Sequence, residues 1–286
     1  NSMLYLTLAV IASTLIIVTF KLFEKYGIEK LPAISTNYFV ASLLGYLTVY
    51  DQVHFAEFPQ KKWFWSAIIV GFTLIIAFNF FAMSAQKAGV SITAIASRMS
   101  VVIPVTLGLL IFDDAATPLK IAGIVTGLVA FYMTFKKEKG VEVNKKYVYL
   151  PFLLFLAVGI NDSMLKVSQH YFIDGEFVLF LATAFLVALI IGTVVSFISD
   201  GKKTFRFKKK NLIAGTLLGI FNWYSTFYFL RGMDTIPVSV IVPIYNVSVV
   251  ALSTILGFVI FKERITRDNW IGVILAVAAI IMIARA

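Results

Sequence analysis

The sequence predicts an all-α integral membrane protein with ten transmembrane helices, arranged as two inverted five-helix repeats. Three observations predict it: ten stretches can cross a bilayer, the last five resemble the first five, and polar residues are scarce. The chain has 286 residues, of which 60% are hydrophobic and 14% charged, and its mean hydropathy is +0.91. Soluble domains average about 45–50% apolar and about 25% charged residues, so the expected solvent is lipid.

The ten predicted spans follow one another with short connections. A helix needs about 20 mostly apolar residues to cross the hydrocarbon layer. The apolar runs are continuous, whereas the strands of a membrane barrel alternate, so strands are not expected. The predicted spans cover residues 3–20, 31–50, 63–86, 90–112, 118–135, 147–171, 177–198, 211–231, 238–261 and 269–284.

An internal repeat relates the two halves. A shift of about 149 positions aligns them without gaps from the third span onward, and it places Gly108 on Gly257 and Asp114 on Glu263. Glycine pairs carry the most weight, because they mark close approach of helix backbones. Each half has an odd number of spans, so the second half must insert upside down relative to the first, with a binding site near mid-membrane between them. The predicted domains are residues 3–135, a basic linker of residues 136–146, and residues 147–286.

The positive charges are unevenly distributed among the loops. The loops after the odd-numbered spans hold 18 lysines and arginines, and those after the even-numbered spans, with the C-terminus, hold 5. The positive-inside rule therefore predicts that the odd loops face the cytoplasm and that both termini lie outside a cell (inner or plasma) membrane. The net charge of +10 indicates contact with the lipid bilayer and not a nucleic-acid partner.

Several functional classes lack their motifs. Cysteine is absent, and His54 and His170 are the two histidines, which leaves few metal ligands. Neither a GxxxxGK[ST] loop nor an HExxH motif occurs. We therefore expect no cofactor, no metal and no enzyme activity.

Two GxxxG motifs, Gly123–Gly127 and Gly215–Gly219, allow close approach of helices. In an internally duplicated chain, packing within the monomer is expected to be their role, with dimerisation as the alternative. Both a monomer and a homodimer stay open.

Arg98 is an ionisable residue inside a predicted span, flanked by Ser97 and Ser100. A charge at that depth costs several kcal/mol and needs a partner, water or a function. Arg98 could bind a carboxylate or phosphate through two hydrogen bonds. The alternative is an arginine that snorkels to the interface or pairs with an acid of the protein.

Asp162 and Lys166 lie one turn apart in the sixth predicted span, and Asn161 extends this polar segment. They could form a substrate site, with Asp162 as the candidate for proton coupling, because a carboxylate at depth can take up and release a proton. A self-neutralising pair facing a polar cavity is the simpler reading. A third option is that the span ends early and leaves Lys166 at the interface.

Other polar or aromatic side chains inside spans are candidates for lining a substrate cavity, although packing and interfacial belts are commoner uses of such aromatics. They are Asn79, Asn222, Trp223, Tyr228, Tyr245 and Asn246. Pro104 and Pro243 interrupt backbone hydrogen bonding in spans four and nine, and either is a hinge or an ordinary tolerated kink.

The segment 261–272 resembles the end of an EamA-like domain of the drug/metabolite transporter superfamily. Such domains typically end with a Gly-Glu-x-Leu-Thr type turn, a polar residue, a Trp or Gln, and a Gly that opens the last helix. Glu263, Thr266, Trp270 and Gly272 fit, whereas Lys262 stands where the family often has Gly. The matching residues of the first half are Asp114, Thr117 and Gly123, with Asp in place of Glu. The resemblance covers essentially the whole chain and implies a secondary transporter of small metabolites. It also implies a central cavity lined by the first four helices of each half, with the fifth and tenth packed outside it.

These observations predict a secondary active transporter for a small polar metabolite, with an amino acid or related carboxylate favoured. Transport would proceed by alternating access, with proton coupling as a further hypothesis. The alternatives are a carrier of phosphorylated or nucleotide-linked sugars or of a lipid-type substrate. From other classes, an integral-membrane enzyme or a channel remains open.

Overall fold

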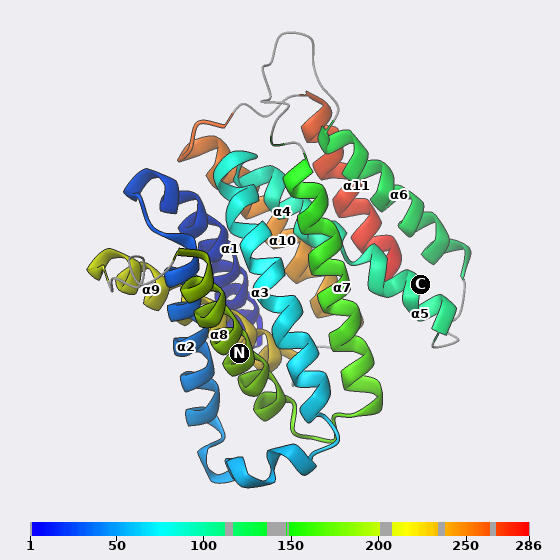
Figure 1. Ribbon diagram of the computed structural model, residues 1–286. Coiled ribbons are helices and arrows are strands. Elements are labelled where there is room, and N and C mark those ends of the chain that lie inside the picture. Colours follow the sequence, from blue (N-terminus) through cyan, green and yellow to red (C-terminus); the bar gives the residue numbers. More distant parts are fainter. Residues whose placement is uncertain are drawn as a thin grey trace.

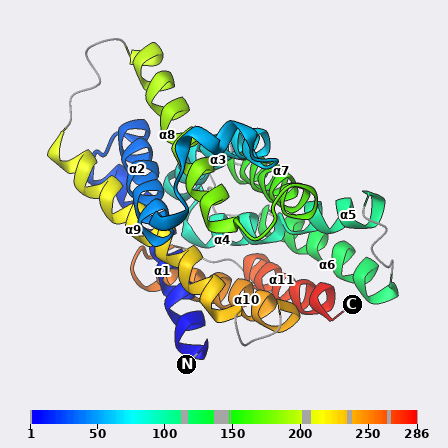
Figure 2. The same ribbon diagram turned by 90° about the horizontal axis from the view of Figure 1, so that it is seen from below.

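The computed structural model describes residues 2–111, 117–135, 147, 149–200, 208–233, 238–263 and 267–285. Within these ranges the chain is helical and contains no strand, as Figures 1 and 2 show. The basic linker at residues 136–146, Asp114 and Thr266 lie outside them. The elements are α1 (Ser2–Tyr26), α2 (Lys30–Thr48), η1 (Tyr50–Gln52), η2 (Phe55–Gln60), α3 (Phe64–Lys87), α4 (Val90–Met99), α5 (Val102–Ile111), α6 (Pro118–Phe135), α7 (Tyr149–Tyr171), α8 (Phe177–Asp200), α9 (Lys209–Met233), α10 (Val238–Val259) and α11 (Arg267–Ala284).

The helices lie at the positions of the predicted spans, but not all of them are apolar enough to be identified as membrane-spanning. In the described parts of the chain, six helical stretches are long and apolar enough to cross a membrane. They are Met3–Tyr26, Phe64–Lys87, Val90–Leu110, Tyr149–Tyr171, Phe177–Val195 and Arg267–Ala284, with shorter apolar helices at Pro118–Ala130 and Ile244–Val259. The protein is therefore all-helical with several membrane-spanning helices, and the full set of ten spans stays a prediction.

The helices α2 and α9 are not among these six, because they carry polar residues that pack against each other. Asn222 donates a hydrogen bond to the Oδ1 atom of Asn37 at 3.2 Å, and both side chains are buried. Polar groups buried by neighbouring helices do not meet lipid. A helix with such a polar buried face has a lower overall apolarity.

The fourth predicted span is broken into α4 and α5, and Pro104 explains where. The backbone turns at Ser100 and Val101, four and three residues before the proline. A proline ring clashes with the carbonyl of the fourth residue before it and cannot donate the hydrogen bond that this carbonyl expects. Ile103 instead donates to the Ser100 carbonyl at 2.9 Å. Pro243, by contrast, lies within α10, which is continuous.

The packing of the helices is nearly unchanged when the two halves are exchanged. α1 packs on α9 as α7 packs on α3, and α2 packs on α9 as α8 packs on α3. The pairs α2–α8, α4–α10 and α6–α11 each join counterparts; α6 and α11 lie together at one side of the bundle (Figures 1 and 2). We call α1, α2 and α9 the first bundle, and α3, α7 and α8 the second bundle.

Both GxxxG motifs pack within the chain, as expected. A Cβ atom on Gly215 would lie 2.5 Å from the Ala33 carbonyl oxygen of α2, and one on Gly219 would lie 2.7 Å from that of Asn37. On α6, a Cβ atom on Gly123 would lie 3.0 Å from the backbone nitrogen of Ile283 in α11. These glycines let helix backbones touch.

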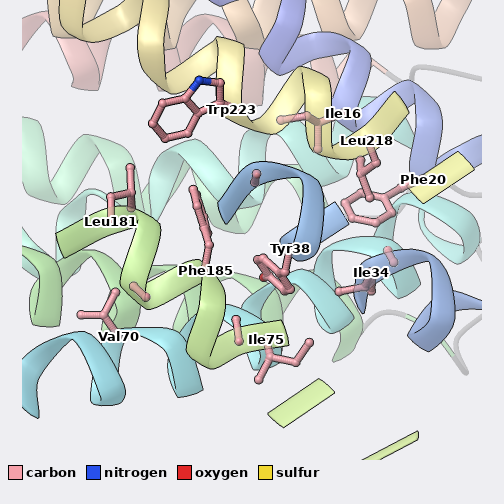
Figure 3. Close-up of a cluster of buried hydrophobic side chains, with 14 of the residues drawn as sticks. Ile16, Phe20, Ile34, Tyr38, Val70, Ile75, Leu181, Phe185, Leu218 and Trp223 are labelled. Carbon is pink, nitrogen blue, oxygen red and sulfur yellow. The ribbon is translucent and has the colours of Figure 1, made fainter. Parts of the chain in front are cut away.

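The larger hydrophobic cluster lies where the two bundles meet. Figure 3 shows Tyr38 of α2 beside Phe185 of α8, with Phe20 of α1 in the same cluster. The rings of Tyr38 and Phe185 stack with centroids 5.9 Å apart. The Tyr38 hydroxyl donates to the Leu74 carbonyl of α3 at 2.9 Å, so the phenol is satisfied although the ring is fully buried.

Two glutamates at opposite ends of the molecule each hold one bundle together in the same way. Glu176, just before α8, accepts hydrogen bonds from Lys61 at 2.7 Å and from the Trp63 indole at 2.6 Å, at the start of α3. Glu29, just before α2, accepts from Lys208 and, at 3.0 Å, from Asn211, at the start of α9. Each glutamate thus receives one ammonium and one neutral N–H donor. We call these contacts the Glu176 clamp and the Glu29 clamp.

Glu176→Gln should lower the melting temperature of the detergent-solubilised protein by a few degrees at pH 7. The hydrogen bonds from Lys61 and Trp63 hold the pKa of Glu176 below its ordinary value. Stabilisation of this sign is present above the unfolded-state pKa and is lost as the pH falls through the folded-state pKa. Melting curves of the two proteins should therefore converge in acid. The control is Asp51→Asn in the exposed helix η1; an equal shift there would contradict the prediction.

Candidate functional site

Arg98 lies in the last turn of α4, directly before the break. Its Nη2 atom donates to Ser13 Oγ of α1 at 2.6 Å, and its Nη1 atom donates to Asn246 Oδ1 of α10 at 3.2 Å. The guanidinium also lies over the Tyr245 ring, 4.8 Å from its centroid. Tyr245 is itself held by Phe229 of α9, with ring centroids 4.6 Å apart. Arg98 is therefore held by α1 and α10 and does not snorkel.

The Nε atom of Arg98 is buried and has no hydrogen-bond partner. An unpaired buried donor costs about 1–3 kcal/mol, and more on a charged group. The neighbours of the guanidinium are neutral oxygen acceptors and an aromatic ring, so they orient the charge without neutralising it. An incoming anion could complete the set.

Asp162 on α7 lies within electrostatic reach of Arg98. Its neighbour Asn161 is buried and accepts a hydrogen bond from Thr73 of α3 at 2.9 Å, and its amide lies 3.5 Å from Asp162 Oδ1. The polar segment of α7 is thus fastened to α3. We call Ser13, Arg98, Asp162, Tyr245 and Asn246 the polar centre.

The polar centre draws on α1, α4, α7 and α10, which are the first and fourth helices of each half. Among these, α4 packs on α10, α7 and α1, and α1 packs on α10. The structure therefore brings together four of the predicted site residues: Arg98, Asp162, Tyr245 and Asn246. Asn161 borders this group through Asp162.

Ser13 is a member of the polar centre that the sequence analysis missed. A single serine in an apolar helix usually bonds to its own backbone, so its residue type carries little signal. Its place opposite the half-buried Arg98 becomes informative only once the helices are packed.

Other predicted site residues lie elsewhere. Asn222 bonds to Asn37 between α9 and α2, and Trp223 is a buried core residue whose ring would lie 3.0 Å from a Cβ atom on Gly45 of α2. The prediction that these two side chains line a cavity stays untested, and their contacts favour packing. Aromatics in membrane helices commonly pack in this way, and their sequence does not reveal which face is lined.

The other three predicted site residues, Tyr228, Lys166 and Asn79, lie on α9, α7 and α3. The ring of Tyr228 stacks with Tyr224 at 5.4 Å and with Tyr5 of α1 at 6.1 Å. Lys166 lies one turn beyond Asp162 on α7 and is half-buried, and Asn79 is half-buried on α3. Their roles stay predictions.

An apolar groove of about 430 Å³ runs along the seam between α1 and α10. Its lining includes Val10, one turn before Ser13, and Ile244, two residues before Asn246. The remaining lining residues are Met3, Leu6, Thr7, Ile11, Ser248, Ala251, Leu252 and Ile255. The groove therefore adjoins the polar centre from the outer side of the seam.

Metal chemistry finds no support in the described residues, where no three His, Cys, Asp or Glu side chains gather as ligands. What the polar centre can do is bind an anion, through a fixed guanidinium with a spare donor.

The second half of the chain is similar to a known protein family. Residues 146–285 match the EamA-like transporter family. The chain is also 26% identical over 284 residues to a protein of Haemophilus influenzae described as uncharacterized, covering 96% of this chain and 95% of that protein.

Proposed function

We propose that this multi-pass membrane protein is a secondary active transporter of a small polar anion, because residues 146–285 match the EamA-like transporter family, a domain family of the drug/metabolite transporter superfamily. An amino acid or a related carboxylate is the favoured substrate. One observation carries this proposal: the buried, unpartnered Nε atom of Arg98 in the polar centre.

The substrate class follows from the shape of the guanidinium. Nε and one Nη form an edge with two parallel N–H donors, which matches the two oxygens of a carboxylate. Nη2 donates to Ser13 and Nη1 donates to Asn246, and these two hydrogen bonds fix the plane of the guanidinium. A phosphate would fit the same edge, which keeps sugar phosphates as the second candidate.

Alternating access is supported by the packing of the helices. The main contacts persist when each helix is exchanged for its counterpart in the other half, and the Glu29 and Glu176 clamps are likewise counterparts at opposite ends. Inverted repeats can rock around a central site so that it opens to either side. With the loops after odd-numbered spans in the cytoplasm, both termini would lie outside.

A thermal-shift screen of the purified protein tests the substrate class, because a ligand that binds the folded state raises its stability by mass action. The panel should contain amino acids, their amides and small carboxylates, together with sugar phosphates and nucleotide sugars. We expect stabilisation by carboxylates and none by the matching amides. Stabilisation by phosphorylated sugars alone would favour the second candidate. In liposomes, saturable counterflow is expected, and an ohmic current would instead indicate a channel.

Asp162→Asn should uncouple transport from protons. The acid lies within electrostatic reach of Arg98, so binding of the substrate anion and protonation of Asp162 would influence each other. We expect uptake driven by an imposed pH gradient to fall at least tenfold, while counterflow without a gradient persists. Asp174→Asn, in the loop between α7 and α8, is the control. Unchanged gradient-driven uptake in Asp162→Asn would remove the coupling hypothesis.

A further inference from the structure

The chain turns back after α10, so that Glu263 lies beside the last turn of that helix. Lys262 adopts a positive φ of 51°, and the backbone nitrogen of Glu263 donates to the Gly257 carbonyl at 3.0 Å. A Cβ atom on Gly257 would lie 2.6 Å from Glu263 Oε2, and one on Gly89, in the α3–α4 turn, would lie 2.8 Å from Oε1. The two glycines thus leave room for the carboxylate.

This carboxylate fastens the end of α10 to the start of α4. It accepts hydrogen bonds from the backbone nitrogens of Val90 at 2.7 Å and Ser91 at 3.2 Å, and from the Ser91 hydroxyl at 3.2 Å. The first N–H groups of a helix have no partner within the helix and attract negative charge. Lys21 of α1 lies 3.8 Å from the same carboxylate.

Further contacts tie α1 to α3 at the same end of the molecule. Lys21 donates to the Gln86 carbonyl at 3.2 Å, and Lys87 pairs with Glu24. The ends of α1 and α10 lie at the upper end of the bundle in Figure 1. Here α1 of the first bundle packs extensively on α3 of the second.

The opposite end differs. Of the described residues, α7 and α9 are the counterparts of α1 and α3, yet they are not among the extensively packed pairs. This is the main departure from the exchange symmetry of the helices. The contact between α1 and α3 therefore has no equally extensive counterpart, although α2 and α8 also join the two bundles.

We propose that Glu263 is the latch of a gate that closes this end of the protein, with Lys21 and the Lys87–Glu24 pair as its further contacts. The inference rests on the proposed transport function. The latch joins α10 and α4, while the lysine contacts join α1 to α10 and α3. α10 and α4 cannot separate at this end until Glu263 leaves the start of α4. The structure then represents a state that is closed at the lysine-rich face.

A cysteine behind the latch can report the opening, because the natural chain has none. Ser253 lies one turn before Gly257 on α10, is fully buried, and its hydroxyl has no partner, so Ser253→Cys should be well tolerated. Inside-out vesicles expose the lysine-rich face to a membrane-impermeant maleimide. We expect Glu263→Gln to raise the labelling rate of this cysteine at least tenfold.

Glu176→Gln is the matched control, because it removes a clamp at the opposite end and should leave that rate unchanged. Ser42→Cys, buried between α2 and α8, reports folding and should stay protected in the Glu263→Gln background. If Ser42→Cys loses its protection, Glu263→Gln has disturbed the fold, and Lys21→Gln then tests the same gate with a smaller perturbation. An unchanged labelling rate of Ser253→Cys in the Glu263→Gln background, with Ser42→Cys still protected, would overturn the gate. Labelling needs no substrate, so faster labelling in a protein that transports nothing would support the gate and count against the proposed function.

Discussion

Arg98→Gln should weaken binding of any carboxylate that stabilises the wild-type protein by at least about 100-fold. The lost pair of charge-assisted hydrogen bonds corresponds to about 3 kcal/mol. Glutamine keeps a polar group at the position but removes the positive charge and the edge of two parallel donors. The measurement is the concentration dependence of the thermal shift, repeated for each ligand that the screen identifies.

Two conservative substitutions test whether the loss of affinity is specific to the guanidinium of Arg98. Arg98→Lys keeps the charge but not the planar edge, and we expect it to lose most of the affinity, because an ammonium cannot replace the two parallel donors. Tyr245→Phe keeps the ring below the guanidinium and should bind nearly as well as wild type. Equal affinity in Arg98→Gln and wild type would show that the anion binds elsewhere. Melting of the ligand-free variants separates a loss of binding from a loss of folding.

Gly215→Leu should prevent stable folding. Any side chain at this position of α9 would overlap the Ala33 carbonyl and the Thr36 side chain of α2, both 2.5 Å from the added Cβ. Backbone atoms cannot rotate away as a side chain can, so α2 and α9 would have to separate. Overpacking against flexible neighbours costs about 1–3 kcal/mol, and contact with a backbone should cost more.

The matched control lies two residues away on the same helix. Leu217 is 46% exposed, so Leu217→Ala should leave melting and the yield of monodisperse protein almost unchanged. Gly215→Ala should fall between the two variants. A Gly215→Leu protein that elutes and melts as wild type does would mean that α2 and α9 do not pack as described here.

The sequence predicted the positions of the helices well, because apolar runs and charged loops mark where a chain can leave the membrane. It predicted the break at Pro104 and the continuity at Pro243 less well, since both prolines remove the same hydrogen bond. Whether a helix then breaks depends on what surrounds the freed carbonyl. Arg98 and Asp162 stood out because charge in an apolar span is costly wherever it points. Trp223 and Asn222 could not be placed, since these helices are apolar around most of their circumference and no periodic pattern distinguishes a core face from a cavity face.

The short helix α4 has a consequence for how binding and gating influence each other. Its first residues hold the Glu263 carboxylate, and its last turn carries Arg98. Ten helical residues span about 15 Å, and the interruption at Ser100 frees them from α5. If α4 tilts at one end, its other end moves as well. Binding of an anion at Arg98 and release of Glu263 are therefore mechanically coupled through α4. Thermodynamic reciprocity then requires that an anion which favours release of Glu263 must bind more tightly, by the same factor, once Glu263 is released.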